Sequence, residues 1–168
     1  MKKIERAIAA FNGNLVLSAE TLNVLSARTL NGLSARREEI YKDVPLVENP
    51  YTNLLNDINS KKRKHNQADY GPKYDPKENL CGTQMCTAGH LINMGGESGY
   101  ALLKKCGSFS EAATLIHLKS CPDMPLQNFG GIEQSHAMAY IELMAEFEQR
   151  PDKSVNFSEF FELKLIEE

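Results

Sequence analysis

Residues 80–90, with the sequence LCGTQMCTAGH, decide the fold that we expect for this chain. They hold two of the four cysteines, one of the four histidines and two of the eleven glycines. Gly82 can adopt backbone angles that cost other residues energy, and the Thr83 hydroxyl can cap a helix by accepting from an amide two or three residues on. The stretch therefore predicts a helix from about Thr83 to Asn93, ended by the glycines at 95–96.

The predicted helix gathers small and reactive residues on one face. Cys86, Gly89 or His90, and Asn93 are spaced by three or four residues and lie near that face. Ala88 and Gly89 have almost no side chain, so another element can pack close to the helix backbone. We expect a mostly α-helical, compact domain around this Cys- and Gly-rich helix, with these motif residues in its core: Cys81, Gly82, Thr83, Cys86, Ala88 and Gly89.

The two motif cysteines also suggest thiol chemistry. Cys81 would precede the helix N-terminus, where the positive end of the helix dipole lowers the pKa of a thiol. Cys81 or Cys86 is therefore a candidate nucleophile, and the candidate bases are His90, His117 and His136. Free cysteines are nevertheless among the most buried residue types, so a packing role is the favoured interpretation.

A zinc site is the third interpretation of the motif. Cys81, Cys86 and His90 could bind the ion together with Cys106, Cys121 or His117. However, the spacing Cys-x4-Cys-x3-His is not a standard finger pattern, and no second close pair completes it. We therefore expect no metal and no other cofactor.

Length and composition are those of an ordinary globular protein. The chain has 168 residues, 42% of them hydrophobic and 24% charged, which indicates one domain, with or without an appendage. No apolar run is long enough to span a membrane. The N-terminus begins like a signal peptide, but Glu5, Arg6 and Asn12 interrupt it. We expect a cytoplasmic protein, in bacteria or a host cell, with reduced cysteines.

Charge is unevenly distributed along the chain. Residues 1–65 have eleven Lys/Arg and seven Asp/Glu, a net of +4, and residues 66–168 have eight and fifteen, a net of −7, which together give −3. From Glu142 on, the chain has eight acidic and three basic residues, and an acidic tail region of this kind repels nucleic acid and favours basic partners or plain solubility. The basic run Lys61-Lys62-Arg63-Lys64 can contact phosphates, or it can be a solvated helix end where cations complement the helix dipole. We expect the solvated helix end and no nucleic-acid partner.

An eight-residue repeat occupies residues 17–36, as LSAETLNV, LSARTLNG and LSAR. On a straight helix this period drifts by about 80° per repeat, so no long apolar stripe results. The repeat is either a pair of helical turns broken at residues 31–32 or a few rungs of a β-solenoid. Too few rungs are present for a solenoid to stand alone, so helix is favoured. A local duplication that packs is favoured over a binding surface.

The chain is expected to divide into a helical and repeat segment at 1–65, a Gly- and Pro-containing linker at 66–79, and a helical domain at 80–168. Apolar periodicity and end signals predict helices at 2–11, 51–59, 97–106, 132–149 and 158–166. Ser108 and Glu111 have the capping-box spacing for one more helix, which Cys121-Pro122 ends.

From Leu80 to about Glu146 the chain resembles an uncharacterised module of small bacterial and phage proteins. The mark of that module is a Cys-Gly-Thr-x-x-Cys-x-Ala-Gly run, and some members carry it behind pentapeptide-type repeats. Its residues here are Cys81-Gly82-Thr83, Cys86, Ala88-Gly89, Ala112-Ala113, Pro125, Phe129 and Ala137. The resemblance implies no activity, and His90 stands where the family more often has an aromatic residue, which argues against a mechanism that needs His90.

These observations favour a small binding module with a protein partner, in a phage-related setting. A thiol-dependent hydrolase or transferase that uses Cys81 or Cys86 is the alternative, and a structural zinc module is the third hypothesis. No convincing acid–base set is apparent in the sequence, which favours binding over catalysis.

Overall fold

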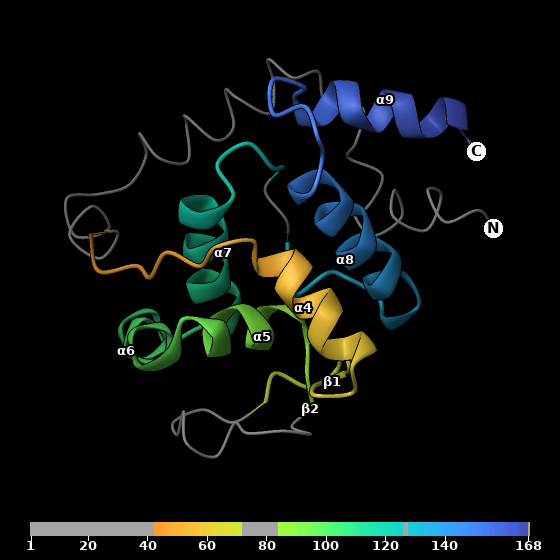
Figure 1. Cartoon of the computed structure of the whole chain (residues 1–168). Coiled ribbons are helices and arrows are strands. Elements are labelled where there is room, and N and C mark those ends of the chain that lie inside the picture. Colours follow the sequence, from red (N-terminus) through yellow and green to blue (C-terminus); the bar gives the residue numbers. More distant parts are fainter. Residues whose placement is uncertain (1–41, 72–83, 126–127, 168) are drawn as a thin grey trace.

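The computed structural model describes residues 42–71, 84–125 and 128–167 (Figure 1). The octad repeat and the helix expected at 2–11 lie outside these residues. The described part is mostly helical, as predicted, with one pair of two-residue strands. Its elements are α4 (Pro50–Asn59), β1 (Lys64–His65), β2 (Gln84–Met85), α5 (Thr87–Met94), α6 (Gly96–Cys106), α7 (Phe109–Ser120), α8 (Gln134–Glu148) and α9 (Phe157–Glu167).

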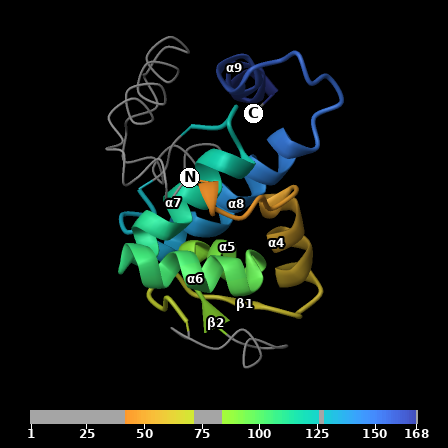
Figure 2. The ribbon, with the colours of Figure 1, turned by 90° about the vertical axis from the view of Figure 1, so that its left-hand side faces the viewer.

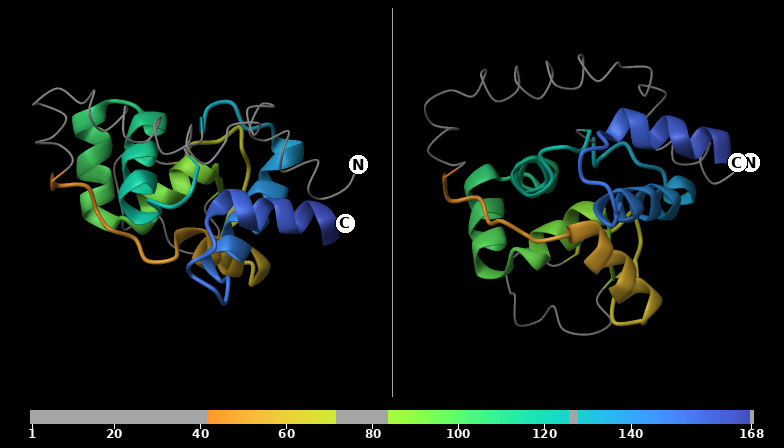
Figure 3. Two further views of the ribbon diagram at one scale, coloured as in Figure 1. Left: turned by 90° about the horizontal axis from the view of Figure 1, so that it is seen from above. Right: turned by 45° about the horizontal axis from the view of Figure 1, so that its top comes forward.

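Two groups of helices make up the described part. Helices α5, α6 and α7 pack against one another, and α4 lies against α8 (Figures 1 and 2). Helix α9 lies on the side of the molecule away from α6 (Figure 3). One buried hydrophobic cluster runs through both groups. It includes Val44, Val47, Tyr51 and Leu54, so residues before the expected linker at 66–79 share a core with residues after it.

Helix α5 is the centre of the fold, as predicted, because Thr87 through Ile92 are all buried. Its start differs from the prediction. The N-cap is Cys86, whose Sγ accepts from the Gly89 N–H at 3.4 Å. Strand β2 precedes it and pairs in parallel with β1, which holds residues 84–85 extended and delays the helix. Gly95 ends α5 as predicted, whereas Cys81, Gly82 and Thr83 lie outside the described residues.

The other helix ends follow their sequence signals closely. Gly107 ends α6 with a left-handed φ of 72°, and the Ser108 hydroxyl then caps α7 by accepting from the Glu111 N–H at 3.4 Å. Helix α4 buries Tyr51 and Leu54. Helix α8 begins two residues later than expected and α9 one residue earlier. These predictions are confirmed because each signal acts within a few residues of the helix end that it sets.

Close packing at Gly89 is present, but its partner is a loop. A Cβ built on Gly89 would lie 2.2 Å from the carbonyl oxygen of Tyr70 and 3.1 Å from the Met85 Cβ. The Cys86 N–H also donates to the carbonyl of Asp69. The expected face-to-face contact between α5 and a neighbour at Gly89 is therefore with backbone at 69–70, which is less able to shift than a side chain.

We predict that Gly89→Ala destabilises the fold. Alanine is the better helix former by about 1 kcal/mol, but its methyl group would overlap the Tyr70 carbonyl. We expect the overlap to dominate, with a net loss on the order of 1–3 kcal/mol in chemical denaturation. Ser98→Ala, at an exposed site in α6, is the control and should be neutral or slightly stabilising. A Gly89→Ala chain as stable as the wild type would mean that the loop does not press on α5.

Candidate functional site

The motif cysteine that the structure describes has a capping role. Cys86 is fully buried, and burial raises the pKa of its thiol. Its Sγ already accepts from the backbone of α5, so at neutral pH it is a protonated cap and not an accessible thiolate. This position contradicts the proposed use of Cys86 as a nucleophile. Cys81 lies outside the described residues, so both the favoured packing role and the alternative nucleophilic role stay predictions for it.

His90 is buried beside His65, and both rings hold β1 onto α5. The rings stack with centroids 5.9 Å apart. His90 Nε2 lies 3.2 Å from the carbonyl oxygen of Lys64, and His65 Nε2 lies 3.2 Å from the Thr87 hydroxyl. Burial lowers the pKa of His90 to about 3, helped by His65 and Arg63, and burial lowers the pKa of His65 to about 4. Both rings are therefore neutral, and His90 is too weak a base for the role suggested above.

The residues proposed for zinc are not assembled in the described part of the chain. Cys86 and His90 lie at the start of α5, Cys106 ends α6, and Cys121 follows α7. Within 42–71, 84–125 and 128–167, no three His, Cys, Asp or Glu side chains form a group that could hold a metal ion.

The basic run after α4 is divided by the structure. Arg63 points inward: its Nε donates to Asp57 Oδ2 at 2.8 Å, and its Nη1 donates to the side-chain oxygen of Asn93. Arg63 is therefore not available to a phosphate, the less favoured of the two roles suggested for the basic run, and it is not a solvated residue either. Lys61, Lys62 and Lys64 are exposed.

A buried polar network at Tyr51 was not predicted from the sequence. The Tyr51 hydroxyl lies 2.7 Å from His117 Nδ1 and 3.0 Å from the Tyr140 hydroxyl, while His117 Nε2 lies 3.1 Å from the Pro125 carbonyl. Because a carbonyl only accepts, Nε2 carries the proton of the neutral ring. Tyr51 then donates to His117 and accepts from Tyr140. Burial lowers the pKa of His117 to about 4 and raises the pKa of both tyrosines.

Glu148, the last residue of α8, caps the N-terminus of α4 from a distance of 97 residues along the chain. Its Oε1 accepts from the Tyr51 N–H at 3.0 Å and its Oε2 from the Thr52 N–H at 2.7 Å. Asn49, the N-cap residue, makes no side-chain cap of its own. Burial raises the pKa of Glu148, opposed by these hydrogen bonds. In the sequence, the only signal of this capping role is the place of Glu148 at the end of a helix, where a carboxylate is unfavourable for that helix.

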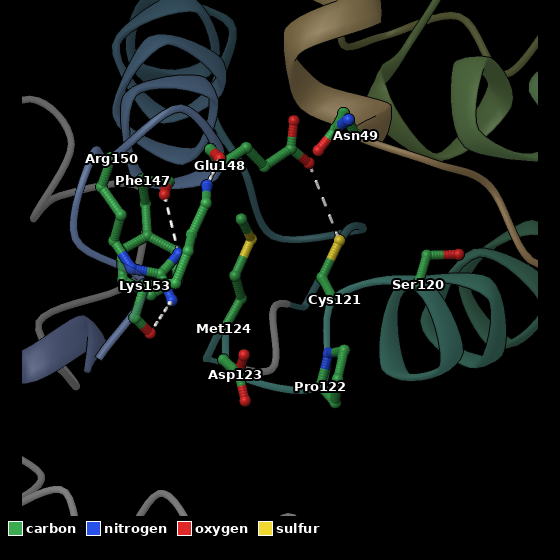
Figure 4. A pocket seen from close by; sticks show the side chains of 10 residues that line it. All are labelled: Asn49, Ser120, Cys121, Pro122, Asp123, Met124, Phe147, Glu148, Arg150 and Lys153. Atoms are coloured by element: carbon green, nitrogen blue, oxygen red, sulfur yellow. Dashed lines mark hydrogen bonds between the residues drawn. The ribbon is translucent and has the colours of Figure 1, made fainter. Parts of the chain in front are cut away.

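A polar cavity of about 220 Å³ lies beside this cap (Figure 4). The Cys121 thiol lines it and donates to Glu148 Oε1 at 3.8 Å. Burial and the Glu148 carboxylate both raise the pKa of Cys121, so this thiol is not an activated nucleophile. Arg150 lies 3.6 Å over the Phe147 ring, and Lys153 Nζ donates to the Glu148 carbonyl at 2.5 Å. The cavity therefore holds groups that brace the end of α8.

Comparisons with models of known families, with curated proteins and with solved structures find no match to this chain. The resemblance to the Cys-Gly-Thr-x-x-Cys module stays a prediction. Among the described residues, no helix is long and apolar enough to cross a membrane.

The lowered pKa values of His65, His90 and His117 predict that acid destabilises the fold. In an unfolded chain a histidine binds a proton below about pH 6.5, whereas the folded rings have pKa values of about 4, 3 and 4. Their contribution to stability is therefore complete above the unfolded pKa and is lost as pH falls toward the folded values. Each ring should contribute a slope of up to about 1.4 kcal/mol per pH unit.

Denaturant titrations between about pH 7 and pH 5 would measure this slope above the range where most carboxylates titrate. His65→Gln, at a half-buried ring, should make the slope shallower by about one histidine's share. A stability that is constant over this range would contradict the neutral state of the three rings in the folded chain.

Proposed function

We propose that this chain is a small protein-binding module whose partner docks on the outer face of α9. The observation that carries this proposal is a pair of neighbouring aliphatic side chains turned to solvent. Leu163 is 55% exposed and Ile166 is 82% exposed. Spaced by three residues, they lie side by side on the helix surface.

Helix α9 is fixed in place by its opposite face. Phe157, Phe160 and Phe161 are buried, and the Phe147 ring of α8 lies 5.1 Å from Phe157 and 5.4 Å from Phe160. On the flank, Lys164 Nζ lies 3.3 Å from Glu146 Oε2. The aromatic contacts therefore turn the opposite face of α9 toward α8 and leave the aliphatic pair on the outside.

The exposed face has the composition of a helix-binding surface. Glu159, Glu162, Leu163 and Ile166 follow one another at steps of three, one and three residues, which puts them on one stripe. Of the large hydrophobic residues exposed in the described part, the other two, Leu46 and Tyr70, lie elsewhere in the chain. Grouped exposed aliphatics are typical of protein interaction sites, and the carboxylates beside them favour a partner helix with Lys or Arg flanks.

Binding fits the described residues better than catalysis does. Four of the Cys and His side chains that they contain are buried and hold helix ends or loops: Cys86, His90, His117 and Cys121. Their pKa values are shifted in the directions that keep the thiols protonated and the imidazoles neutral. These groups support a stable scaffold, which leaves its surface for recognition.

The proposal predicts that a cationic amphipathic peptide binds at α9. The probe is a helical peptide of about fifteen residues with leucines at i, i+3 and i+4 and lysine flanks. The control peptide has the same leucines but glutamate flanks. We expect the lysine form to bind and to shift the amide resonances of α9, and the glutamate form to bind more weakly. Leu163→Ser with Ile166→Ser should weaken binding by about tenfold or more without loss of stability.

Leu46→Ser is the control, because Leu46 is 65% exposed at a site away from α9. It should leave peptide binding unchanged. Equal binding by the wild type and the α9 variant would refute the proposed face. Concentration-dependent self-association of the wild type that the α9 variant lacks would instead identify a second copy as the occupant.

A further inference from the structure

The turn that follows α4 is held rigidly in place. The carbonyl oxygen of Asp57 accepts from the Lys62 N–H at 2.9 Å and from the Arg63 N–H at 3.2 Å. The Asp57 carboxylate accepts a hydrogen bond from Arg63 Nε, and the side-chain oxygen of Asn93 in α5 accepts one from Arg63 Nη1. Beyond the turn, Lys64 pairs with Gln84 in the strand ladder. Arg63 therefore fastens the turn to both α4 and α5.

Backbone geometry within the turn is unusual for its sequence. Lys61 has a left-handed φ of 59°, although it is not a glycine. A residue with a Cβ adopts this conformation at an energetic cost and keeps it only where the surrounding contacts impose it. Lys61, Lys62 and Lys64 are left exposed around the inward-pointing Arg63.

From this arrangement we infer that Lys61, Lys62 and Lys64 form a docking point for a short acidic segment of a partner protein. The three lysines lie within four consecutive positions and are all exposed, so their positive charges are concentrated at one place on the surface. The ion pairs of the described residues include none of their ammonium groups. A partner's carboxylates would supply the missing counter-charges.

The surroundings favour an acidic protein segment over nucleic acid. Residues 66–168 have eight Lys/Arg and fifteen Asp/Glu, so a net of −7 lies on the rest of the chain and would repel a long polyanion. The turn itself carries no aromatic ring on which a base could stack. A short segment with two or three carboxylates complements the charge of the three lysines and is too short to reach the acidic rest of the chain.

This docking point is separate from the face proposed on α9. In both views of the fold, β1 and the turn before it lie at the end of α4 that is far from α9 (Figures 1 and 2). The two surfaces also have opposite charge, so they select different partner segments. Either proposed surface can therefore be refuted by experiment without affecting the other.

Anisotropy of labelled probes with the full chain would test the inference. The probes are an acidic peptide of about ten residues, a neutral peptide of the same length and a thymidine oligonucleotide of matched charge. We expect the acidic peptide to bind most tightly and its affinity to fall between low salt and about 0.3 M salt. The pair Lys61→Glu and Lys62→Glu should weaken its binding by about tenfold or more.

Two further variants keep the outcome interpretable. Lys42→Glu with Lys104→Glu makes the same change of charge at exposed lysines elsewhere and should alter affinity less than about twofold. Arg63→Lys keeps the charge but loses the planar contacts to Asp57 and Asn93, so weaker peptide binding is expected from a loosened turn. Thermal melts check that each variant is folded.

Three results would each overturn the inference. The first is no binding of the acidic peptide at the lowest salt, which would make the turn a solvated helix end. The second is tighter binding of the oligonucleotide, which would make phosphate the ligand. The third is an equal loss of affinity in the control pair, which would mean that net charge and not the turn governs binding.

Discussion

The hydrogen bond from the Tyr51 hydroxyl to His117 Nδ1, at 2.7 Å, is the contact on which the described fold depends. It joins α4 to α7, and the same hydroxyl reaches Tyr140 of α8. The backbone of Tyr51 is bound as well, through Glu148. A buried polar group without a partner is costly, so these contacts fix a single packing position of α4 against α7 and α8.

The position of α4 is connected to the turn and the strands that follow it in the chain. Asp57 near its end holds Arg63, Arg63 reaches Asn93, and the turn leads into β1. Strand β1 pairs with β2, which keeps residues 84–85 extended and leaves Cys86 to begin α5. The position of α4 is thereby linked, through Asp57 and Arg63, to the strand pair that precedes the central helix.

Local features of the fold could be predicted from the sequence, and distant ones could not. The helix ends at Gly95 and Gly107 and the cap at Ser108 depend on residues within a few positions, so short signals sufficed. The start of α5 depends on strand pairing with residues some twenty positions earlier, and the cap on α4 comes from 97 residues away. No local pattern contains either contact.

Chemical roles were hardest to assign from sequence because burial decides them. Cys86 and His90 have the residue types of an active site, but their burial leaves the first a protonated thiol and the second a neutral ring. Arg63 has the residue type of a phosphate ligand, but its guanidinium is bound to the Asp57 carboxylate. With these groups used to build the scaffold, we propose that recognition takes place at two surfaces of opposite charge, at α9 and at the turn after α4.

Tyr51→Phe tests the dependence on Tyr51 most directly. Phenylalanine fills the same space but leaves the His117 acceptor and the Tyr140 hydroxyl without Tyr51, so we expect a loss of about 1–3 kcal/mol in the free energy of unfolding. Faster hydrogen exchange of the α4 amides should accompany it. Tyr70→Phe, at an exposed tyrosine, should change stability by less than about 0.5 kcal/mol. A Tyr51→Phe chain as stable as the wild type, with α4 equally protected, would contradict the account.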